Sequence, residues 1–180
     1  MRRKNSPYGN ASIRYRPMPS HLILGGRRSG KSAFAEAEAL ALKKPLTYIA
    51  TSRAYDKDHA ERINLHRQRR QGEGWTVHES GDPTELQGHL NLASGAVLVD
   101  CLSMWLNNIF LDNIDIPPLT LPVTDAYLIL VSTEVGLGIH SETSLGRRYA
   151  DKLGELNQSI AAQADKVSFV AAGLNLKLKG

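Results

Sequence analysis

The chain has 180 residues, of which 42% are hydrophobic, and it carries a formal net charge of +4 at pH 7. This length suffices for one substantial core and is short for two, and no segment approaches the roughly 20 consecutive apolar residues of a membrane-spanning helix. The single cysteine, Cys101, excludes an internal disulfide and a cysteine-rich zinc site. We therefore expect a cytoplasmic protein with no membrane span.

Residues 1–20 are predicted to be a disordered basic extension. They combine the start Arg2-Arg3-Lys4 with three prolines and show no apolar periodicity, a composition typical of disorder. A second basic cluster spans Arg62–Arg70. Basic clusters attract nucleic acid or phosphorylated small molecules, and charge alone does not separate these partners. Residues 21–180 are predicted to form a single domain.

From His21 onward, short apolar runs alternate with helical stretches, which is typical of a parallel sheet with crossover helices. The predicted strands span residues 21–24, 46–51, 96–100, 126–132 and 167–172. The predicted helices span residues 31–43, 57–71, 102–111 and 144–164. The expected fold class is α/β, with a mostly parallel sheet flanked by helices.

The segment between Asp100 and Ala126 needs a crossover if its flanking strands are parallel. Three prolines, Pro117, Pro118 and Pro122, prevent a helix from continuing past about residue 112. We therefore expect a short and partly irregular crossover over residues 112–125.

Residues 25–32 match the P-loop pattern Gly-x-x-x-x-Gly-Lys-Ser. In this pattern the backbone N–H groups surround phosphates, the lysine reaches the outer phosphates and the hydroxyl binds Mg²⁺. A predicted strand precedes the motif and a predicted helix follows it, as phosphate binding at a helix N-terminus requires. The predicted nucleotide-binding residues here are Gly25, Gly26, Arg27, Arg28, Ser29, Gly30, Lys31 and Ser32, with Lys31 also catalytic.

Asp100 closes the apolar run Ala96–Val99 at a predicted strand end. P-loop proteins supply a carboxylate from another buried strand to hold Mg²⁺, so we expect Asp100 and Ser32 to be the metal-binding residues. The alternative is that Asp100 caps the following helix, because aspartate is also a favoured N-cap residue.

Four cationic or titratable side chains share one face of the predicted helix 57–71. Arg62, His66, Arg69 and Arg70 stand at offsets of 0, 4, 7 and 8. Guanidinium groups disfavour protonation of a neighbouring imidazole, and a neutral imidazole is a nucleophile whose phosphate target the arginines would bind. The alternative interpretation is an exposed, arginine-rich surface helix.

From about residue 22 to the C-terminus, the chain resembles the bifunctional adenosylcobinamide kinase/adenosylcobinamide-phosphate guanylyltransferase family of cobalamin biosynthesis. The matching stretches are GGRRSGKS (25–32), YIATS (48–52), RINLHRQRR (62–70), GW (74–75), VDCLSMWLNN (99–108), TEVGLGI (133–139) and NQSIAAQADKV (157–167). The resemblance implies a RecA-like P-loop NTPase fold and a homotrimer.

The resemblance also implies two reactions. In the first, the γ-phosphoryl group of ATP or GTP moves to the aminopropanol hydroxyl of adenosylcobinamide. In the second, GMP from GTP becomes attached to a histidine and then passes to the new phosphate. The family's guanylylated histidine corresponds to His66, and the implied nucleotide-binding set also includes Thr51, Ser52, Arg62, Arg69 and Arg70. On this interpretation the partners are Mg²⁺, nucleotide and corrinoid, with no nucleic acid.

Three stretches depart from the family's common pattern. Asp56-Lys57-Asp58-His59 stands where members commonly have Asp-x-Glu-Met, and Thr133–Gly136 stands where they have Asn-Glu-Val-Gly. The proline-rich segment 112–125 replaces a longer helical crossover. Two rival functions stay open. One is a monofunctional P-loop kinase in which His66 is idle, and the other is a nucleotide-binding module whose catalysis is lost through the shortened crossover.

Overall fold

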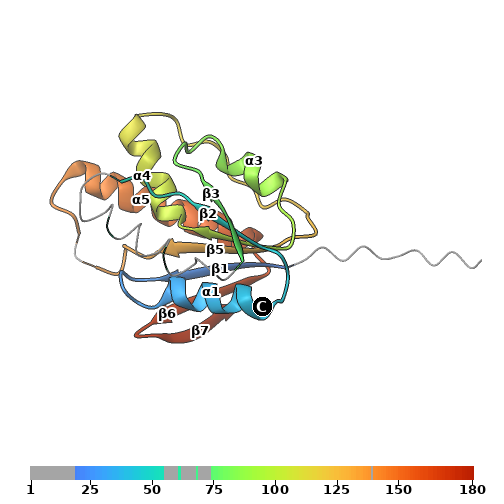
Figure 1. The fold of residues 1–180 in the computed structure, drawn as a ribbon. Helices are drawn as coiled ribbons and strands as arrows, with labels where there is room; N and C mark the ends of the chain where they lie inside the picture. The colour runs from blue at the N-terminus through green and yellow to red at the C-terminus, as the bar shows by residue number, and fades with distance from the viewer. Residues whose placement is uncertain (1–18, 55–60, 62–67, 69–73, 139) are drawn as a thin grey trace, which may run out of the picture.

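The described residues of the computed structural model, 19–54, 61, 68, 74–138 and 140–180, form a seven-stranded sheet (Figure 1). The strands in spatial order are β3 (Trp75–Glu79), β2 (Leu46–Ala50), β4 (Ala96–Asp100), β5 (Tyr127–Thr133), β1 (Ser20–Gly25), β6 (Lys166–Ala171) and β7 (Leu174–Lys179). All neighbouring strands are parallel except β6 and β7, which are antiparallel. The predicted α/β fold with a mostly parallel sheet is confirmed.

Helices cover both faces of this sheet (Figure 1). The described helices are α1 (Lys31–Ala41), α3 (Leu86–Asn91), α4 (Leu102–Asp112) and α5 (Ser144–Gln163). Alternate residues of a strand point to opposite faces, so Ile23 of β1 packs with α1 whereas Leu22 and Leu24 pack with the other three helices. Because both faces are covered, the inner strands are largely apolar on both faces, as in Leu22–Leu24 of β1 and Ala96–Val99 of β4.

The five strands and three of the four helices predicted from apolar runs are present. The boundary of the extension is off by one residue, since Ser20 already begins β1 and its backbone N–H donates to the Asp165 carboxylate at 2.8 Å. The predicted helix 57–71 lies almost entirely outside the described residues, although Glu61 and Gln68 within it are helical. The remainder of the predicted extension, residues 1–18, also lies outside them.

The strands β3 and β7 and the short helix α3 were not predicted. Both missed strands lie at the edges of the sheet, and every residue of β7 is exposed. An edge strand has one neighbour and little cover, so it lacks the continuous apolar run that identified the central strands.

The crossover after α4 is short and irregular, as the prolines predict. The helix ends at Asp112, and Asn113 takes the left-handed conformation with a φ of 50°. From there to Ala126 the chain has no helix or strand, and Leu119 anchors it in the core with 7% of its surface exposed. Within the described part of the chain, no helix is long and apolar enough to cross a membrane.

Candidate active site

The P-loop lies at the carboxyl edge of the sheet, between the end of β1 at Gly25 and the start of α1 at Lys31 (Figure 1). Two of its residues have positive φ angles, 58° at Arg28 and 97° at Gly30. The Ser29 N–H donates to the Gly26 carbonyl at 3.2 Å. A loop with such left-handed residues turns successive backbone N–H groups to one side and forms a concave anion-binding surface, which the N-terminal end of α1 completes.

The turn of the β6–β7 hairpin supports this loop from the side. The Gly173 N–H donates to the Ser29 carbonyl at 2.8 Å. A Cβ atom added to Gly30 would lie 3.2 Å from the Gly173 Cα. The P-loop is therefore fixed both by its own backbone bonds and by a strand pair that comes last in the chain.

The side chains of the P-loop have different environments. The Lys31 ammonium donates to the Gly26 carbonyl at 3.1 Å, so the side chain lies across the loop. Arg27 and Arg28 are exposed. Ser29 is buried, and its hydroxyl oxygen is, among the described residues, the one buried side-chain nitrogen or oxygen without a hydrogen-bond partner.

Asp100 and Ser32 come together although they are 68 positions apart in the chain. The Ser32 hydroxyl donates to Asp100 Oδ1 at 3.4 Å, and the Tyr48 hydroxyl donates to Asp100 Oδ2 at 2.9 Å. The N-cap residue of α4 is Cys101, without a side-chain cap, so the alternative in which Asp100 caps this helix is wrong.

These oxygens fit Mg²⁺, which takes hard oxygen ligands and keeps waters and substrate phosphates in its shell. No group of three or more His, Cys, Asp or Glu side chains within the described residues could hold a metal ion. A metal beside Ser32 and Asp100 would therefore take the rest of its coordination shell from waters and nucleotide phosphates.

Thr51 and Ser52 follow β2 at the same edge of the sheet. Thr51 is fully buried, and its hydroxyl donates to the Cys101 carbonyl at 2.8 Å while it accepts from the Cys101 N–H at 2.9 Å. The Thr51 side chain therefore holds together the chain segments that leave β2 and β4. Ser52 is half-buried in the loop.

A largely buried chain of polar groups begins at Cys101, next to Asp100. The Cys101 sulfur lies 2.9 Å from the Ser103 hydroxyl, which in turn lies 3.1 Å from the Thr133 hydroxyl. Burial, followed by the negative charge of Asp100, raises the pKa of the Cys101 thiol to about 11. At neutral pH this cysteine is therefore a protonated packing residue.

Helix α4 holds the loops that follow β2 and β3. The Asn108 amide nitrogen donates to the Thr51 carbonyl at 2.8 Å and to the Gly81 carbonyl at 3.1 Å. The Trp105 indole N–H donates to the Pro83 carbonyl at 2.7 Å. The stretch VDCLSMWLNN thus combines the Asp100 carboxylate with two side chains that position neighbouring loops.

The structure brings the predicted P-loop residues, Thr51, Ser52 and Asp100 to one edge of the sheet. The predicted residues Arg62, His66, Arg69 and Arg70 lie outside the described residues. Sequence reasoning assigned no role to Tyr48, Asn108 or Gly173. For Gly173 a signal was available, because the alternation Leu174-Asn175-Leu176-Lys177-Leu178-Lys179 after a glycine indicates a hairpin.

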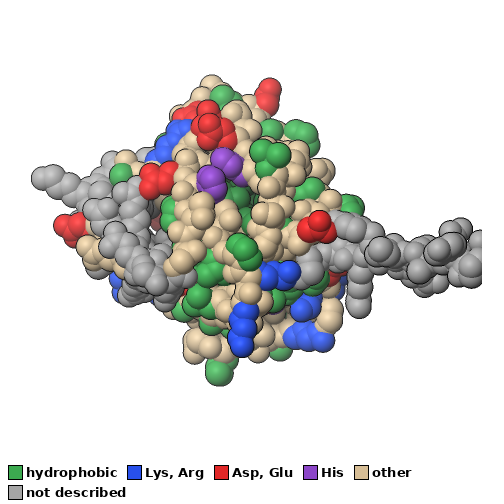
Figure 2. Space-filling view, turned by 45° about the vertical axis from the view of Figure 1, so that its right-hand side comes forward, with side chains coloured by type: hydrophobic (Ala, Val, Ile, Leu, Met, Phe, Trp, Pro, Cys, Tyr) green, Lys and Arg blue, Asp and Glu red, His purple; other side chains and the backbone are tan. Residues whose placement is uncertain are grey.

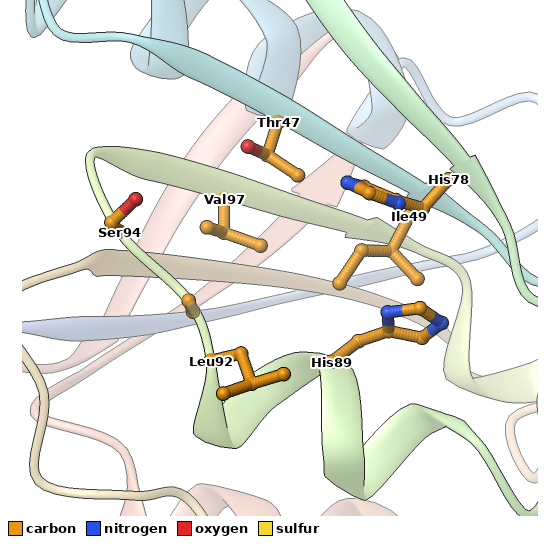
Figure 3. Close-up of a pocket in the computed structure, with 8 residues that line it drawn as sticks. Thr47, Ile49, His78, His89, Leu92, Ser94 and Val97 are labelled. Atoms are coloured by element: carbon orange, nitrogen blue, oxygen red, sulfur yellow. The ribbon is translucent and has the colours of Figure 1, made fainter.

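A separate pocket of about 230 Å³ lies over β2, β3 and β4. Figure 3 shows His78 on β3 and His89 on α3 along one side of it, and Thr47 and Ile49 of β2 and Val97 of β4 also line it. The two imidazole rings lie 5.4 Å apart. In the space-filling view, histidine side chains lie next to one another at the surface (Figure 2). None of the P-loop residues lines this pocket.

Comparison with known proteins matches most of the chain to one family. Residues 21–178 match the model of the family described as cobinamide kinase/cobinamide phosphate guanyltransferase. The chain is 41% identical to the bifunctional adenosylcobalamin biosynthesis protein CobP of Pseudomonas aeruginosa, covering 88% of this chain and 96% of the relative. It is 33% identical to the bifunctional adenosylcobalamin biosynthesis protein CobU of Escherichia coli, covering 88% and 98%.

Among solved structures, the chain is similar to an ATPase of the bacterial type III secretion system, with a TM-score of 0.50 and 10% identity, covering 89% of this chain and 58% of the other. It is also similar to the flagellar accessory protein FlaH of Methanocaldococcus jannaschii, with a TM-score of 0.50 and 13% identity, covering 91% and 79%. At these identities the likeness concerns the fold alone, and it confirms the predicted RecA-like P-loop fold.

Proposed function

The chain belongs to the cobinamide kinase/cobinamide phosphate guanyltransferase family, and on that premise we propose that one chain carries out both reactions. It phosphorylates adenosylcobinamide with ATP or GTP and then transfers GMP from GTP to that phosphate, which gives adenosylcobinamide-GDP. The observation that carries the proposal is the convergence of a complete P-loop, Ser32 and Asp100 at one edge of the sheet.

In the kinase step, the backbone N–H groups of residues 25–32 bind the nucleotide phosphates, and the Lys31 ammonium neutralises charge on the outer ones. Ser32 and Asp100 would hold Mg²⁺, which when bound neutralises charge on the β- and γ-phosphates. The substrate hydroxyl attacks the γ-phosphorus, its proton passes to solvent and the nucleoside diphosphate leaves. Ser52 binds the nucleotide beside Thr51, whose hydroxyl positions the loop.

In the transfer step, an imidazole nitrogen of His66 attacks the α-phosphorus of GTP and pyrophosphate leaves. A phosphate oxygen of the phosphorylated corrinoid then attacks the phosphorus of the histidine-bound GMP and frees the imidazole. Arg62, Arg69 and Arg70 neutralise the phosphate oxygens. The support for His66 is its position in the Arg62-Ile63-Asn64-Leu65-His66-Arg67 stretch that resembles the family's guanylylated segment.

We further propose a cytoplasmic homotrimer. The support for the trimer is the resemblance to the family. The support for the cytoplasm is the use of nucleoside triphosphates and the single cysteine, which is free and buried.

The test separates the two steps with two variants. Lys31→Ala should lose phosphorylation of adenosylcobinamide by about 10²- to 10³-fold, as when one electrostatic donor to a transition state is deleted, and it should remain folded. His66→Ala should phosphorylate adenosylcobinamide normally and form no acid-labile protein–GMP adduct from α-labelled GTP. His59→Ala is the control and should form the adduct.

Each rival function has its own outcome in this test. Wild-type protein that phosphorylates the corrinoid and never binds GMP covalently would be a monofunctional kinase. Protein that binds GTP and alters neither GTP nor corrinoid would be a nucleotide-binding module. An adduct that persists in His66→Ala would exclude His66 as the nucleophile.

A further inference from the structure

The Asp100 carboxylate is held by two hydroxyl groups from different elements. Tyr48 of β2 donates to Oδ2 at 2.9 Å, and Ser32 of α1 donates to Oδ1 at 3.4 Å. The shorter bond is to the residue outside the P-loop. One carboxylate oxygen is therefore engaged by the sheet, whereas the other faces the start of α1.

The Tyr48 side chain is itself rigidly placed. Only 3% of its surface is exposed, and its ring packs edge-on against Trp75 with the centroids 6.0 Å apart. Strand β2 is paired on both sides, with Leu98 and Val77 as the register partners of Tyr48. A buried ring on a central strand has little freedom, so its hydroxyl is a fixed donor.

We propose that Tyr48 is a positioning residue for the magnesium–nucleotide complex, because its hydroxyl fixes the Asp100 carboxylate with Oδ1 turned toward Ser32. This inference rests on the proposed function, in which Asp100 and Ser32 would hold the metal. Tyr48 touches neither metal nor phosphate in this role. It acts through the orientation of Asp100.

The χ2 angle of an aspartate side chain has a broad distribution, so the orientation of the carboxylate is set by the groups that contact it. The Asp100 carboxylate therefore needs a partner such as the Tyr48 hydroxyl. Without the Tyr48 hydroxyl, Oδ2 loses a charge-assisted hydrogen bond and the carboxylate rotates more freely. Binding of free nucleotide depends on the P-loop N–H groups and Lys31 and should not change. Binding of the magnesium complex should weaken.

The experiment measures the dissociation constant of a fluorescent ADP analogue in Mg²⁺ and in EDTA. The magnesium ratio is the dissociation constant in EDTA divided by that in Mg²⁺, so it falls when binding of the magnesium complex weakens. In Tyr48→Phe this ratio should fall by about three- to tenfold, which is less than the roughly 10- to 150-fold of a whole hydrogen bond to a charged group because Tyr48 acts only through the orientation of Asp100. The affinity in EDTA should stay within about twofold of wild type. The Mg²⁺ concentration that gives half-maximal kinase activity should rise in parallel.

The matched control is Tyr127→Phe. Tyr127 is also 3% exposed, and its hydroxyl donates to a carboxylate, Glu38 Oε1, at 2.7 Å. It is the first residue of β5, so it lies at the amino ends of the parallel strands, whereas the P-loop lies at their carboxyl ends. Tyr127→Phe removes the same group from an equally buried position, so its magnesium ratio should equal that of wild type.

Asp100→Asn distinguishes failure of this inference from failure of the proposed metal site. If Asp100→Asn lowers the magnesium ratio and Tyr48→Phe does not, the metal site stands and the role of Tyr48 is overturned. If Asp100→Asn leaves the ratio unchanged, the metal role of Asp100 fails and the inference falls with it. Loss of affinity in EDTA by Tyr48→Phe would also overturn it, because a general structural role would then suffice.

Discussion

Gly30 is the glycine of the P-loop that has a left-handed backbone conformation, and it lies against the turn between β6 and β7. Its φ of 97° lies in a region that other residues occupy at a cost of about 1–2 kcal/mol. In Gly30→Ala the new Cβ would also lie 3.2 Å from the Gly173 Cα, so the loop and the β6–β7 turn must move apart by a few tenths of an ångström. Since Gly173 donates to Ser29, this movement also disturbs the P-loop backbone.

The conformational cost alone predicts that the melting temperature of Gly30→Ala falls by about 2–8 °C, at 2–4 °C per kcal/mol for a chain of this size. Kinase kcat/KM should fall by about 10- to 100-fold, because the loop that orients the phosphates is displaced. Gly26→Ala is the matched control for stability in the same loop, since a Cβ there would meet no protein atom within 4 Å. Calorimetry measures both variants, and equal falls in melting temperature in Gly26→Ala and Gly30→Ala would refute the reasoning. A coupled kinase assay compares Gly30→Ala with wild type.

Two further predictions concern titratable groups. Burial raises the pKa of the Cys101 thiol to about 11, so the native protein at pH 8 should react with iodoacetamide far more slowly than the urea-unfolded chain, and equal rates would contradict this burial. The Ser20 N–H, which donates to Asp165, holds the pKa of that carboxyl below its ordinary value of 3.8, so its contribution to stability is present above that value and is lost as the pH falls through the lowered pKa. The melting temperatures of wild type and Asp165→Asn should therefore differ at neutral pH and converge as the pH falls through the lowered pKa, and a gap that stays constant with pH would argue against this linkage.

The sequence alone was sufficient to predict the elements whose structure depends on a few neighbouring residues. The buried strands show as apolar runs because both faces of a central parallel strand are covered. The P-loop shows as a motif because its glycines meet a local backbone requirement, and the end of α4 follows from the prolines that come soon after it. The candidate phosphate-binding residues could therefore be named by number from the sequence.

Tertiary structure decided what depends on residues far apart in the chain. The edge strand β3 depends on its pairing with β2, and its mostly exposed side chains carry no apolar run. The edge strand β7 pairs with β6 and alternates apolar and polar residues, although all of them are exposed. The contact of Gly173 with Ser29 joins positions 144 residues apart, and Tyr48 reaches Asp100 across 52. Such contacts follow from the strand order of the sheet. An apolar run indicates that a strand is buried but does not indicate which strand pairs with it, so the sequence pattern leaves the strand order open.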